Sequence, residues 1–507
     1  MMLPRAELKS FVRSAARELA REPDFAEFEI YAASSEQRIA RLAYTSDIPS
    51  RGVEELKSLG ADGFQVRIVS RRDRHEIGTA SEAGDLSREA LRSAIERARR
   101  SAIVDPHFSG LARDPRKLAT SAGGASDLAR ASDSMLTASA WQVIGGALAA
   151  FRAGYKNSSA HPGLVLGGDL SLVHDRIAIA GSNLADVRTD ESAHFVSSLT
   201  AIVESMDAKG TDTAVGGSIE RIRGAAATLG RNAVRRALAL GAGVRPASGR
   251  YRVILGPQPV AEILNYLVIG SLTTGAFYAA SSAYQGKFAR QVMDERIGLV
   301  DDPALPAGPV RRTVTCEGLR AARTELVRAG RLVGLLSSVY DSHRLESDEL
   351  RAEKLGQDGS GANFPPRAGY RLGEGGGRRF DAEPGSAATN VVMRARGAIS
   401  ERALLHALGD GLYIGRVWYT YPINGQRAGD FTCTVTGDSY LVRDGKLAEP
   451  LAPNSLRINA NIAEVFDQPL AIGSRITPTI VWGSTETYFV PAIATENLAL
   501  AEIGGQT

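Results

Sequence analysis

Cysteine is almost missing from this chain. Its 507 residues include two cysteines, Cys316 and Cys433. So few thiols exclude a scaffold held together by disulfides, and they favour a reducing compartment. Both cysteines stand in strand-like segments, where a buried thiol is most simply a small apolar side chain. We therefore expect a cytoplasmic protein in which the cysteines have structural roles.

Closely spaced histidines are missing too. The seven histidines are scattered along the chain as His75, His107, His161, His174, His194, His343 and His406. Two imidazoles on one helix share a metal ion only when they stand about three to five residues apart. The sequence therefore has no local zinc motif. The pair His75-Glu76 is not followed by a second histidine, and we interpret it as structural or exposed.

The chain also lacks a strong net charge and an uninterrupted apolar span. The formal charge is +3, with 44% hydrophobic and 23% charged residues, which is typical of a soluble protein. The first residues do not resemble a signal peptide. The longest apolar stretch, 259–280, is interrupted by Glu262 and Asn265, so a buried helix is the better interpretation. We expect neither a nucleic-acid nor a membrane partner.

Periodicity predicts alternating helices and strands in the first half of the chain. Residues 5–22, 88–103, 134–153 and 219–240 have the apolar spacing of amphipathic helices, and Asp85 and Ser87 suit an N-cap. Alternating or β-prone segments predict strands at 25–33, 37–43, 63–69, 163–182 and 193–205. Residues 211–217 are expected to form a loop.

Residues 241–249, with three glycines and one proline, predict a linker. We therefore expect an N-terminal domain over 1–240, a linker over 241–250 and a C-terminal domain over 251–507. The second half is rich in β-prone runs, among them 411–421, and the Asp444-Gly445 pair predicts a hairpin turn. The fold class follows as α+β: a sheet flanked by helices, then a mostly antiparallel β domain with a central helix.

That central helix is predicted over Pro259–Gly270. A strand-like run, Tyr251–Pro257, leads directly into it, and proline suits a first helical turn because its missing N–H would be unpaired there anyway. Apolar residues recur at helical spacing through Leu264 and Val268. Glu262 is the one carboxylate in this apolar segment.

The hexapeptide Ala261-Glu262-Ile263-Leu264-Asn265-Tyr266 resembles the metal-binding segment of the TldD/PmbA family of metallopeptidase subunits. Further fragments at similar spacing carry the same resemblance over nearly the whole chain. They are Gly63–Arg67, Glu317-Gly318, Ala329-Gly330, Gly429-Asp430-Phe431 and Val490-Pro491.

The resemblance implies a metal site that this chain has lost. Catalytic members carry His-Glu-x-x-x-His on this helix, with the glutamate as general base, and a cysteine ligand just before the last Val-Pro pair. Here Ala261 and Tyr266 replace the two histidines, Glu262 remains, and residues 481–489 contain no cysteine. We therefore predict no catalytic residue and no metal in this chain. Zinc is expected in a TldD-like partner.

Three functions remain open at this point. The first is a TldE-like, non-catalytic subunit that completes the substrate cavity of a heterodimeric protease for unfolded or leader peptides. The second is a stand-alone homodimeric peptide-binding protein. The third is an active peptidase with an unusual site built on Glu262, Tyr266 and a distant histidine.

Other candidate features have simpler structural interpretations. The glycine-rich segment Gly373–Arg379 lacks the strand and helix that frame a phosphate loop. Asp301, Asp302 and Glu317 are interpreted as turn residues. Residues 352–388 are expected to form a long loop, either a lid over the substrate groove or a disordered surface insertion.

Overall fold

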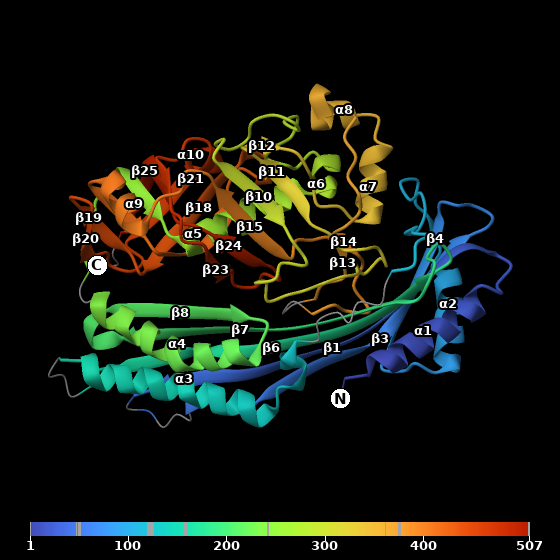
Figure 1. The fold of residues 1–507 in the computed structure, drawn as a ribbon, viewed down its shortest axis with the longest axis horizontal. Coiled ribbons are helices and arrows are strands. Elements are labelled where there is room, and N and C mark those ends of the chain that lie inside the picture. Colours follow the sequence, from blue (N-terminus) through green and yellow to red (C-terminus); the bar gives the residue numbers. More distant parts are fainter. Residues whose placement is uncertain are drawn as a thin grey trace.

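The computed structural model describes residues 2–46, 48, 52–118, 126–156, 161–240, 243–359, 361–373 and 377–504. Residues 241–242 of the predicted linker and 374–376 of the glycine-rich segment therefore lie outside the described residues. Two layers make up the molecule: the first half of the chain forms a long sheet with helices beneath it, and the second half rests on top (Figure 1).

The N-terminal sheet has eight strands in the order β5-β4-β3-β1-β6-β7-β8, with β2 paired to β1. Its described neighbours are all antiparallel. The strands are β1 (Phe25–Thr45), β2 (Gly52–Val53), β3 (Lys57–Ser70), β4 (Glu76–Ala83), β5 (Ile103–Val104), β6 (Leu164–Gly181), β7 (Arg188–Val203) and β8 (Ala208–Gly216).

Alternation along β1 assigns the two faces of this sheet. Ile30 and Ala32 pack with α1 (Arg5–Leu19) and α2 (Arg88–Arg100), and further along Ala40 and Leu42 pack with α3 (Asp133–Gly154) and α4 (Ile219–Leu240). The intervening Tyr31 and Ala33 point the other way, into the core of the second half. Because side chains alternate along a strand, four helices cover one face, and the C-terminal half covers the other.

Two helices of the N-terminal half, α2 and α3, begin at serine N-caps. Ser87 accepts a hydrogen bond from the backbone N–H of Ala90, and Ser132 accepts one from that of Met135. Each serine satisfies a donor that has no partner inside its helix. Helix α3 has the length and composition of a membrane span, but its buried face packs on the sheet and on α4, as in a globular core.

The C-terminal half contains two further main sheets. One has the order β12-β11-β10-β15-β24-β23, and the other β17-β18-β21-β25-β9-β16-β19-β20, with β22 on β25. Two neighbouring pairs, β15–β24 and β9–β16, are parallel, and the other described pairs are antiparallel.

The first of these sheets comprises β10 (Ile297–Asp301), β11 (Thr324–Arg328), β12 (Arg331–Leu332), β15 (Asn390–Ala395), β23 (Thr477–Ile480) and β24 (Thr487–Val490). The second comprises β9 (Gly249–Leu255), β16 (Gly411–Ile414), β17 (Arg416–Pro422), β18 (Asp430–Gly437), β19 (Tyr440–Arg443), β20 (Lys446–Pro450), β21 (Leu456–Asn461), β22 (Ala471–Ile472) and β25 (Ile493–Glu502).

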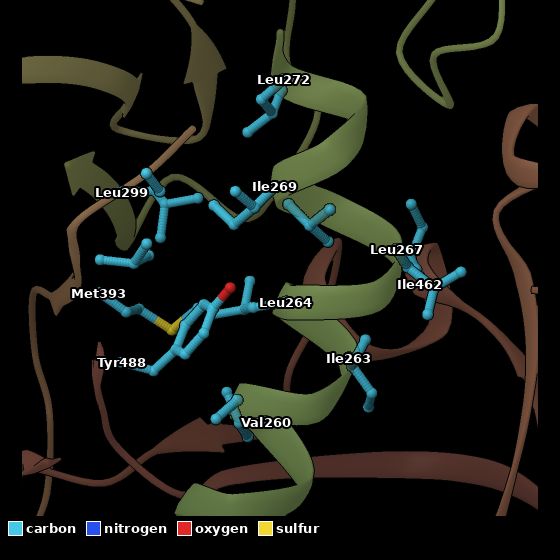
Figure 2. Packing of buried hydrophobic residues seen from close by; sticks show 14 of the residues in the cluster. Val260, Ile263, Leu264, Leu267, Ile269, Leu272, Leu299, Met393, Ile462 and Tyr488 are labelled. Atoms are coloured by element: carbon cyan, nitrogen blue, oxygen red, sulfur yellow. The ribbon is translucent and has the colours of Figure 1, made fainter. Parts of the chain in front are cut away.

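A central helix fills the space within this half, as the sequence predicts. It begins as α5 (Pro257–Ile263) and continues through η3 (Leu264–Ile269) and η4 (Gly270–Leu272). Val260, Leu264 and Ile269 face Leu299 of β10, Met393 of β15 and Tyr488 of β24, while Ile263 and Leu267 lie toward Ile462 (Figure 2). The shorter helices are α6 (Thr274–Tyr278), α7 (Val339–Glu346), α8 (Arg351–Leu355), α9 (Glu401–Leu408) and α10 (Ile462–Phe466).

Two predictions are wrong in extent or type. The separate strands at 25–33 and 37–43 are one strand, β1, because no turn-forming residue interrupts its pairing with β3 and β6. Residues 211–217 are not a loop: β8 pairs residue by residue with β7. The β character predicted for 411–421 is confirmed, with the run divided between β16 and β17 at Gly415, where a side chain would meet the backbone of Asp438.

Segment 352–388 is largely ordered where it is described. It contains most of α8 and two short paired strands, β13 (Gly369–Tyr370) and β14 (Gly385–Ser386). The side chains of Arg371 and Arg378 are fully buried against the N-terminal sheet. A disordered surface insertion is therefore the wrong description of these residues.

Candidate functional site

The helix that carries the degenerate motif changes its winding in the middle of that motif. Residues Pro257–Ile263 are α-helical, and Leu264–Ile269 form a π-helical turn. Such turns are rare and often lie at functional sites. Gln426 supports the widened turn because its side-chain amide donates to the carbonyl oxygens of Tyr266, at 3.2 Å, and Leu267, at 2.7 Å.

Ala261 lies in the hydrophobic core. Its side chain is fully buried, and it belongs to the same cluster as Val260 and Leu264. A methyl group has no donor atom for a metal ion. The first of the two predicted ligand positions is thus occupied by a packing residue.

Glu262 lies beside Ala261 but lines a cavity. Its carboxyl accepts a hydrogen bond of 3.0 Å from the side-chain amide of Gln258, one helical turn earlier. Gln258 is itself held by β17, since it accepts from the N–H of Val417 at 2.9 Å. Burial raises the pKa of Glu262 to about 7, against smaller opposing effects from the hydroxyl of Thr420 and the positive charge of Arg416. The carboxyl is therefore poised to exchange a proton near neutral pH.

Tyr266 occupies the second predicted ligand position, within the π-helical turn. Its phenol donates to the backbone carbonyl of Trp482 at 3.1 Å. Partial burial raises its pKa, and the negative charges of Glu262 and Glu486 raise it further. A phenol that keeps its proton and is engaged with a carbonyl does not suit zinc, which binds deprotonated ligands.

The cavity has a volume of about 740 Å³ and lies between the two layers of the molecule. Its floor is the polar part of the sheet face that the helices leave free, on β1, β6, β7 and β8. Its roof comes from α5, β17 and residues 480–487. The floor is rich in hydroxyl groups, while Trp418, Tyr419 and Trp482 of the roof are aromatic.

These aromatic residues form a cluster at the cavity. The rings of Trp418 and Trp482 lie 5.8 Å apart, and those of Trp418 and Tyr419 lie 5.9 Å apart. Trp482 and Tyr419 are 74% and 72% exposed. Tyr419 also has a φ of 54°, in a bulge of β17 between Trp418 and Tyr421. Large exposed aromatic side chains with a strained backbone are typical of binding surfaces.

Three strands around the cavity are sheet edges. The strands β8, β17 and β23 each end their sheet, and each contributes lining residues. An edge strand presents backbone N–H and C=O groups without a partner on one side. Pro478 in β23 removes one such donor, which is compatible with an edge position only.

The described histidines lie in separate environments. His194 shares the cavity with Glu262, and burial together with the charge of Arg312 lowers its pKa to about 4, so its imidazole is neutral. His174 bonds Glu191 at 2.8 Å, and His75 lies 2.7 Å from the carbonyl oxygen of Phe108. His107 contacts Tyr278.

The other acidic candidates are held by backbone groups. Asp301 accepts hydrogen bonds from the N–H groups of Thr389 and Asn390, and both oxygens of Glu317 accept from that of Val339. Burial raises the pKa of each carboxyl to about 7. Cys316 and Cys433 are buried.

The donor set at the motif does not fit a zinc ion. Across the described ranges, no three His, Cys, Asp or Glu side chains gather in a group that could hold a metal. Phe489 and Tyr488, both buried, precede the final Val-Pro pair where the family resemblance implies a cysteine. Glu262 thus has no ligand neighbour on either side in the motif.

The residues of the aromatic cluster and the strand edges were not singled out by the sequence. The aromatic-rich run 417–421 is a visible signal, but from the sequence alone it indicates only β propensity. Trp482 is remote in the chain and comes next to it only through folding.

Comparisons with known proteins agree with this fold. The PmbA/TldA metallopeptidase C-terminal domain matches residues 248–502. A curated relative, "Metalloprotease" from Methanothermobacter thermautotrophicus, is 24% identical over 246 residues, which cover 48% of this chain and 48% of that protein. The chain therefore spans about half the length of this relative.

A solved structure is similar along almost the whole chain. TldE from Thermococcus kodakarensis superposes with a TM-score of 0.77 at 17% identity, covering 98% of this chain and 100% of that one. At such low identity the likeness establishes the fold. Because the domain match spans half of the sequence, this chain belongs to the PmbA/TldD metallopeptidase family, and its fold is TldE-like.

Proposed function

We propose that this chain is the non-catalytic subunit of a two-subunit metalloprotease. A TldD-like partner would supply the zinc that activates water for hydrolysis of the peptide bond. This chain would complete the cavity and hold part of an unfolded or leader peptide. The cytoplasm is the compartment that suits its unpaired, buried cysteines.

One observation carries the proposal: the motif keeps its glutamate, Glu262, but has no metal-ligating side chain at the two positions where the histidines would stand. Glu262 lines the cavity, but the flanking motif positions hold the buried methyl of Ala261 and the engaged phenol of Tyr266. A glutamate acts as general base in such a site only beside a metal-bound water. Without those ligands Glu262 keeps a packing role, fixed by Gln258.

The cavity supports a role in holding peptide. An extended peptide would pair with the backbone of an edge strand, which binds main chain regardless of sequence. The strands β17 and β23 offer such edges, and Trp418 and Trp482 would contact apolar side chains. The hydroxyl-rich floor would supply hydrogen-bond partners for the peptide's remaining polar groups.

The test is reconstitution with a TldD-like chain from the same genome. An unstructured fluorogenic peptide is incubated with each chain alone and with the mixture. We expect no cleavage by this chain alone and faster cleavage by the mixture than by the partner alone. A chelator should abolish that activity. Cleavage by this chain alone would overturn the proposal and favour a site built on Glu262, Tyr266 and a histidine.

A matched pair of variants tests the peptide-holding role. Trp482→Ala removes an exposed ring at the cavity, and Trp141→Ala removes one on α3, on the opposite side of the sheet. We expect Trp482→Ala to raise KM for the peptide in the mixture and Trp141→Ala to leave KM unchanged. A stable homodimer that binds peptide and does not stimulate the partner would instead establish a stand-alone peptide-binding protein.

A further inference from the structure

A second cavity lies where the two halves of the chain meet, away from the motif helix. Its volume is about 660 Å³. Helix α1, residues 117–118 and the start of β7 form one side, and residues 304 and 312–321 of the C-terminal half form the other. Cavities of this size commonly hold small molecules.

The side chains around this cavity are strongly basic. The cationic lining residues are Lys9, Arg13, Lys117, Arg188, Arg312 and Arg320. Within the described lining, Asp186 alone is acidic. The whole chain is close to neutral, with a formal charge of +3. The excess of positive charge is therefore a local property of this cavity.

The one acidic side chain is already paired. Asp186 lies 3.4 Å from Arg188, and Arg188 also pairs with Asp114 at 3.2 Å. Arg188 donates further to the backbone carbonyls of Asp114 and Arg116. The charge of Arg188 is thus already balanced by carboxylates, and Asp186 is engaged with Arg188 instead of with the remaining cations.

Four of the remaining cations have no carboxylate partner among the described residues. Lys9 and Arg13 stand four residues apart on α1, and this spacing places their side chains on the same face of the helix. Arg320 reaches the cavity from the opposite wall. Within the described part of the chain, no ion pair joins Lys9, Arg13, Lys117 or Arg320 to a carboxylate. Behind them Arg312 is fully buried. Its positive charge helps to lower the pKa of His194, and it also lowers the pKa of the carboxyl of Asp175.

We propose that this cavity binds a small, multiply charged phosphate anion, such as the diphosphate group of a free metabolite. Gathered cations repel one another, and a concave surface concentrates their field on a bound anion. Arginine and lysine are the usual partners of phosphate oxygens, with the arginine fork able to donate two parallel hydrogen bonds. The ligand would touch α1 on one side and Arg320 on the other, and would tie the two halves of the chain together.

The probe is inorganic pyrophosphate, titrated into the full-length chain by calorimetry at constant ionic strength, with sodium chloride as the salt. Arg13→Glu with Arg320→Glu reverses two charges at the cavity. The matched control is Arg17→Glu with Arg323→Glu, which makes the same change in total charge outside the lining. We expect saturable binding that weakens at least tenfold in the first double variant and less than twofold in the second.

Bound pyrophosphate should also raise the unfolding temperature of the wild-type chain, and this rise should vanish in the cavity variant. Equal loss of binding in both double variants would show that pyrophosphate binding depends only on the net charge of the chain, and it would overturn the proposal. Absence of saturable binding would do the same.

A second arm separates a free anion from a lipid headgroup. Sedimentation is compared with vesicles of phosphatidylcholine and with vesicles that also contain phosphatidic acid. We expect no sedimentation with either. Sedimentation that requires phosphatidic acid and is lost in the cavity variant would assign the site to a membrane surface and overturn the free-anion assignment.

Discussion

At the scale of single residues, Glu262 is the unusual group. It is 4% exposed, and its carboxyl has one amide donor at 3.0 Å and no metal ligand beside it in the motif. A buried carboxyl in such surroundings is more stable when protonated. Its pKa of about 7, against a usual value of 4.5, therefore makes the native state bind a proton more tightly than the unfolded state.

The pH dependence of stability follows from this difference. Below pH 4.5 both states keep the proton, and Glu262 has no effect on their balance. Between 4.5 and 7 the unfolded carboxyl ionises first, so the native state loses stability as the pH rises. Glu262→Gln removes the charge. We therefore expect the free energy of unfolding of the variant to rise relative to that of the wild type over this range, by up to about 3 kcal/mol.

Urea denaturation of both proteins between pH 5 and pH 8 measures this gain. Asp301 and Glu317 titrate in the same range but are common to both proteins, so their effects cancel in the difference. If the difference in free energy of unfolding between the variant and the wild type does not change with pH, the expected protonation of Glu262 is contradicted.

The sequence shows which residues occupy the motif positions, but it does not predict which side chains surround them. Ala261 and Tyr266 are visible replacements for histidine in the printed chain, and their chemistry follows directly from the residue type. The engagement of Tyr266 with Trp482 could not be predicted, because it joins residues far apart in the sequence. The same holds for the pairing of Trp418 with Trp482.

At the scale of elements, the central helix depends on one distant side chain. A π-helical turn leaves backbone carbonyls that an α-helix would pair differently. Gln426 donates to those of Tyr266 and Leu267, and it also lies 3.2 Å from the hydroxyl of Ser271. A single amide thus satisfies several acceptors of the turn.

Gln426→Ala should therefore destabilise the chain. Loss of a partly buried donor leaves those carbonyls unsatisfied, at a cost of about 1–3 kcal/mol. The control Gln142→Ala removes an exposed glutamine of α3 and should change the free energy of unfolding by less than about 0.5 kcal/mol. Chemical denaturation of the two variants measures both values, and equal effects would show that Gln426 does not support the turn.

Elements with a local signal were predictable, and those decided by pairing were not. The hairpin β19–β20 follows from Asp444-Gly445, whose φ angles of 49° and 69° suit this dipeptide. The helices α1, α3 and α4 follow from apolar spacing. Strand β8 was missed because Thr211-Asp212-Thr213 has no apolar alternation, and its pairing with β7 and packing against α4 make it a strand.

At the scale of the whole molecule, buried arginines join the two halves. Arg378 of the C-terminal half is fully buried and pairs with Asp175 at 2.6 Å and Asp190 at 2.7 Å, both in the N-terminal sheet. Arg371 pairs in the same way with Glu29 at 2.7 Å. Charges removed from water persist only when they are paired, so these contacts fix the orientation of the halves.

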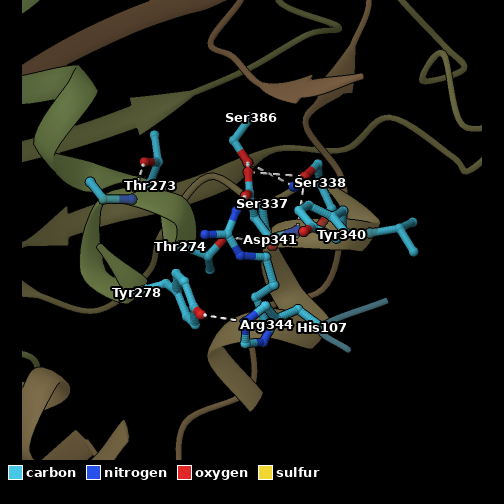
Figure 3. A network of polar contacts seen from close by, with 12 residues as sticks. His107, Thr273, Thr274, Tyr278, Ser337, Ser338, Tyr340, Asp341, Arg344 and Ser386 are labelled. Carbon is cyan, nitrogen blue, oxygen red and sulfur yellow. Dashed lines mark hydrogen bonds and ion pairs between the residues drawn. The ribbon is translucent and has the colours of Figure 1, made fainter. Parts of the chain in front are cut away.

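Other polar contacts across the seam lie nearer the surface. Tyr340 of α7 donates to Asp105 at 2.8 Å, and Tyr278 of α6 contacts His107 (Figure 3). Beside these contacts, within the C-terminal half, Ser386 and Ser338 donate to Asp341 (Figure 3). The sequence marked none of these contacts. The two contacts across the seam join residues that are distant along the chain, and polar character alone does not indicate a partner.

Arg378→Ala should be strongly destabilising, because it leaves Asp175 and Asp190 buried without this charge. We expect a loss of about 3–5 kcal/mol in the free energy of unfolding. The neighbouring Arg379 provides the control. It pairs with Asp381, and the two side chains are 40% and 38% exposed, respectively. Arg379→Ala should therefore lower the free energy of unfolding by less than about 1 kcal/mol. Similar losses in the two variants would contradict the role assigned to Arg378.

The zinc content of this chain, purified alone, is the measurement that tests the central claim most directly. The protein is incubated with excess zinc, passed through gel filtration and analysed by plasma mass spectrometry. A TldD-like chain treated in the same way serves as the positive control. The absence of ligands beside Glu262 predicts far less than one zinc per chain. One tightly held zinc per chain, lost in Glu262→Gln and Tyr266→Phe variants, would contradict the account.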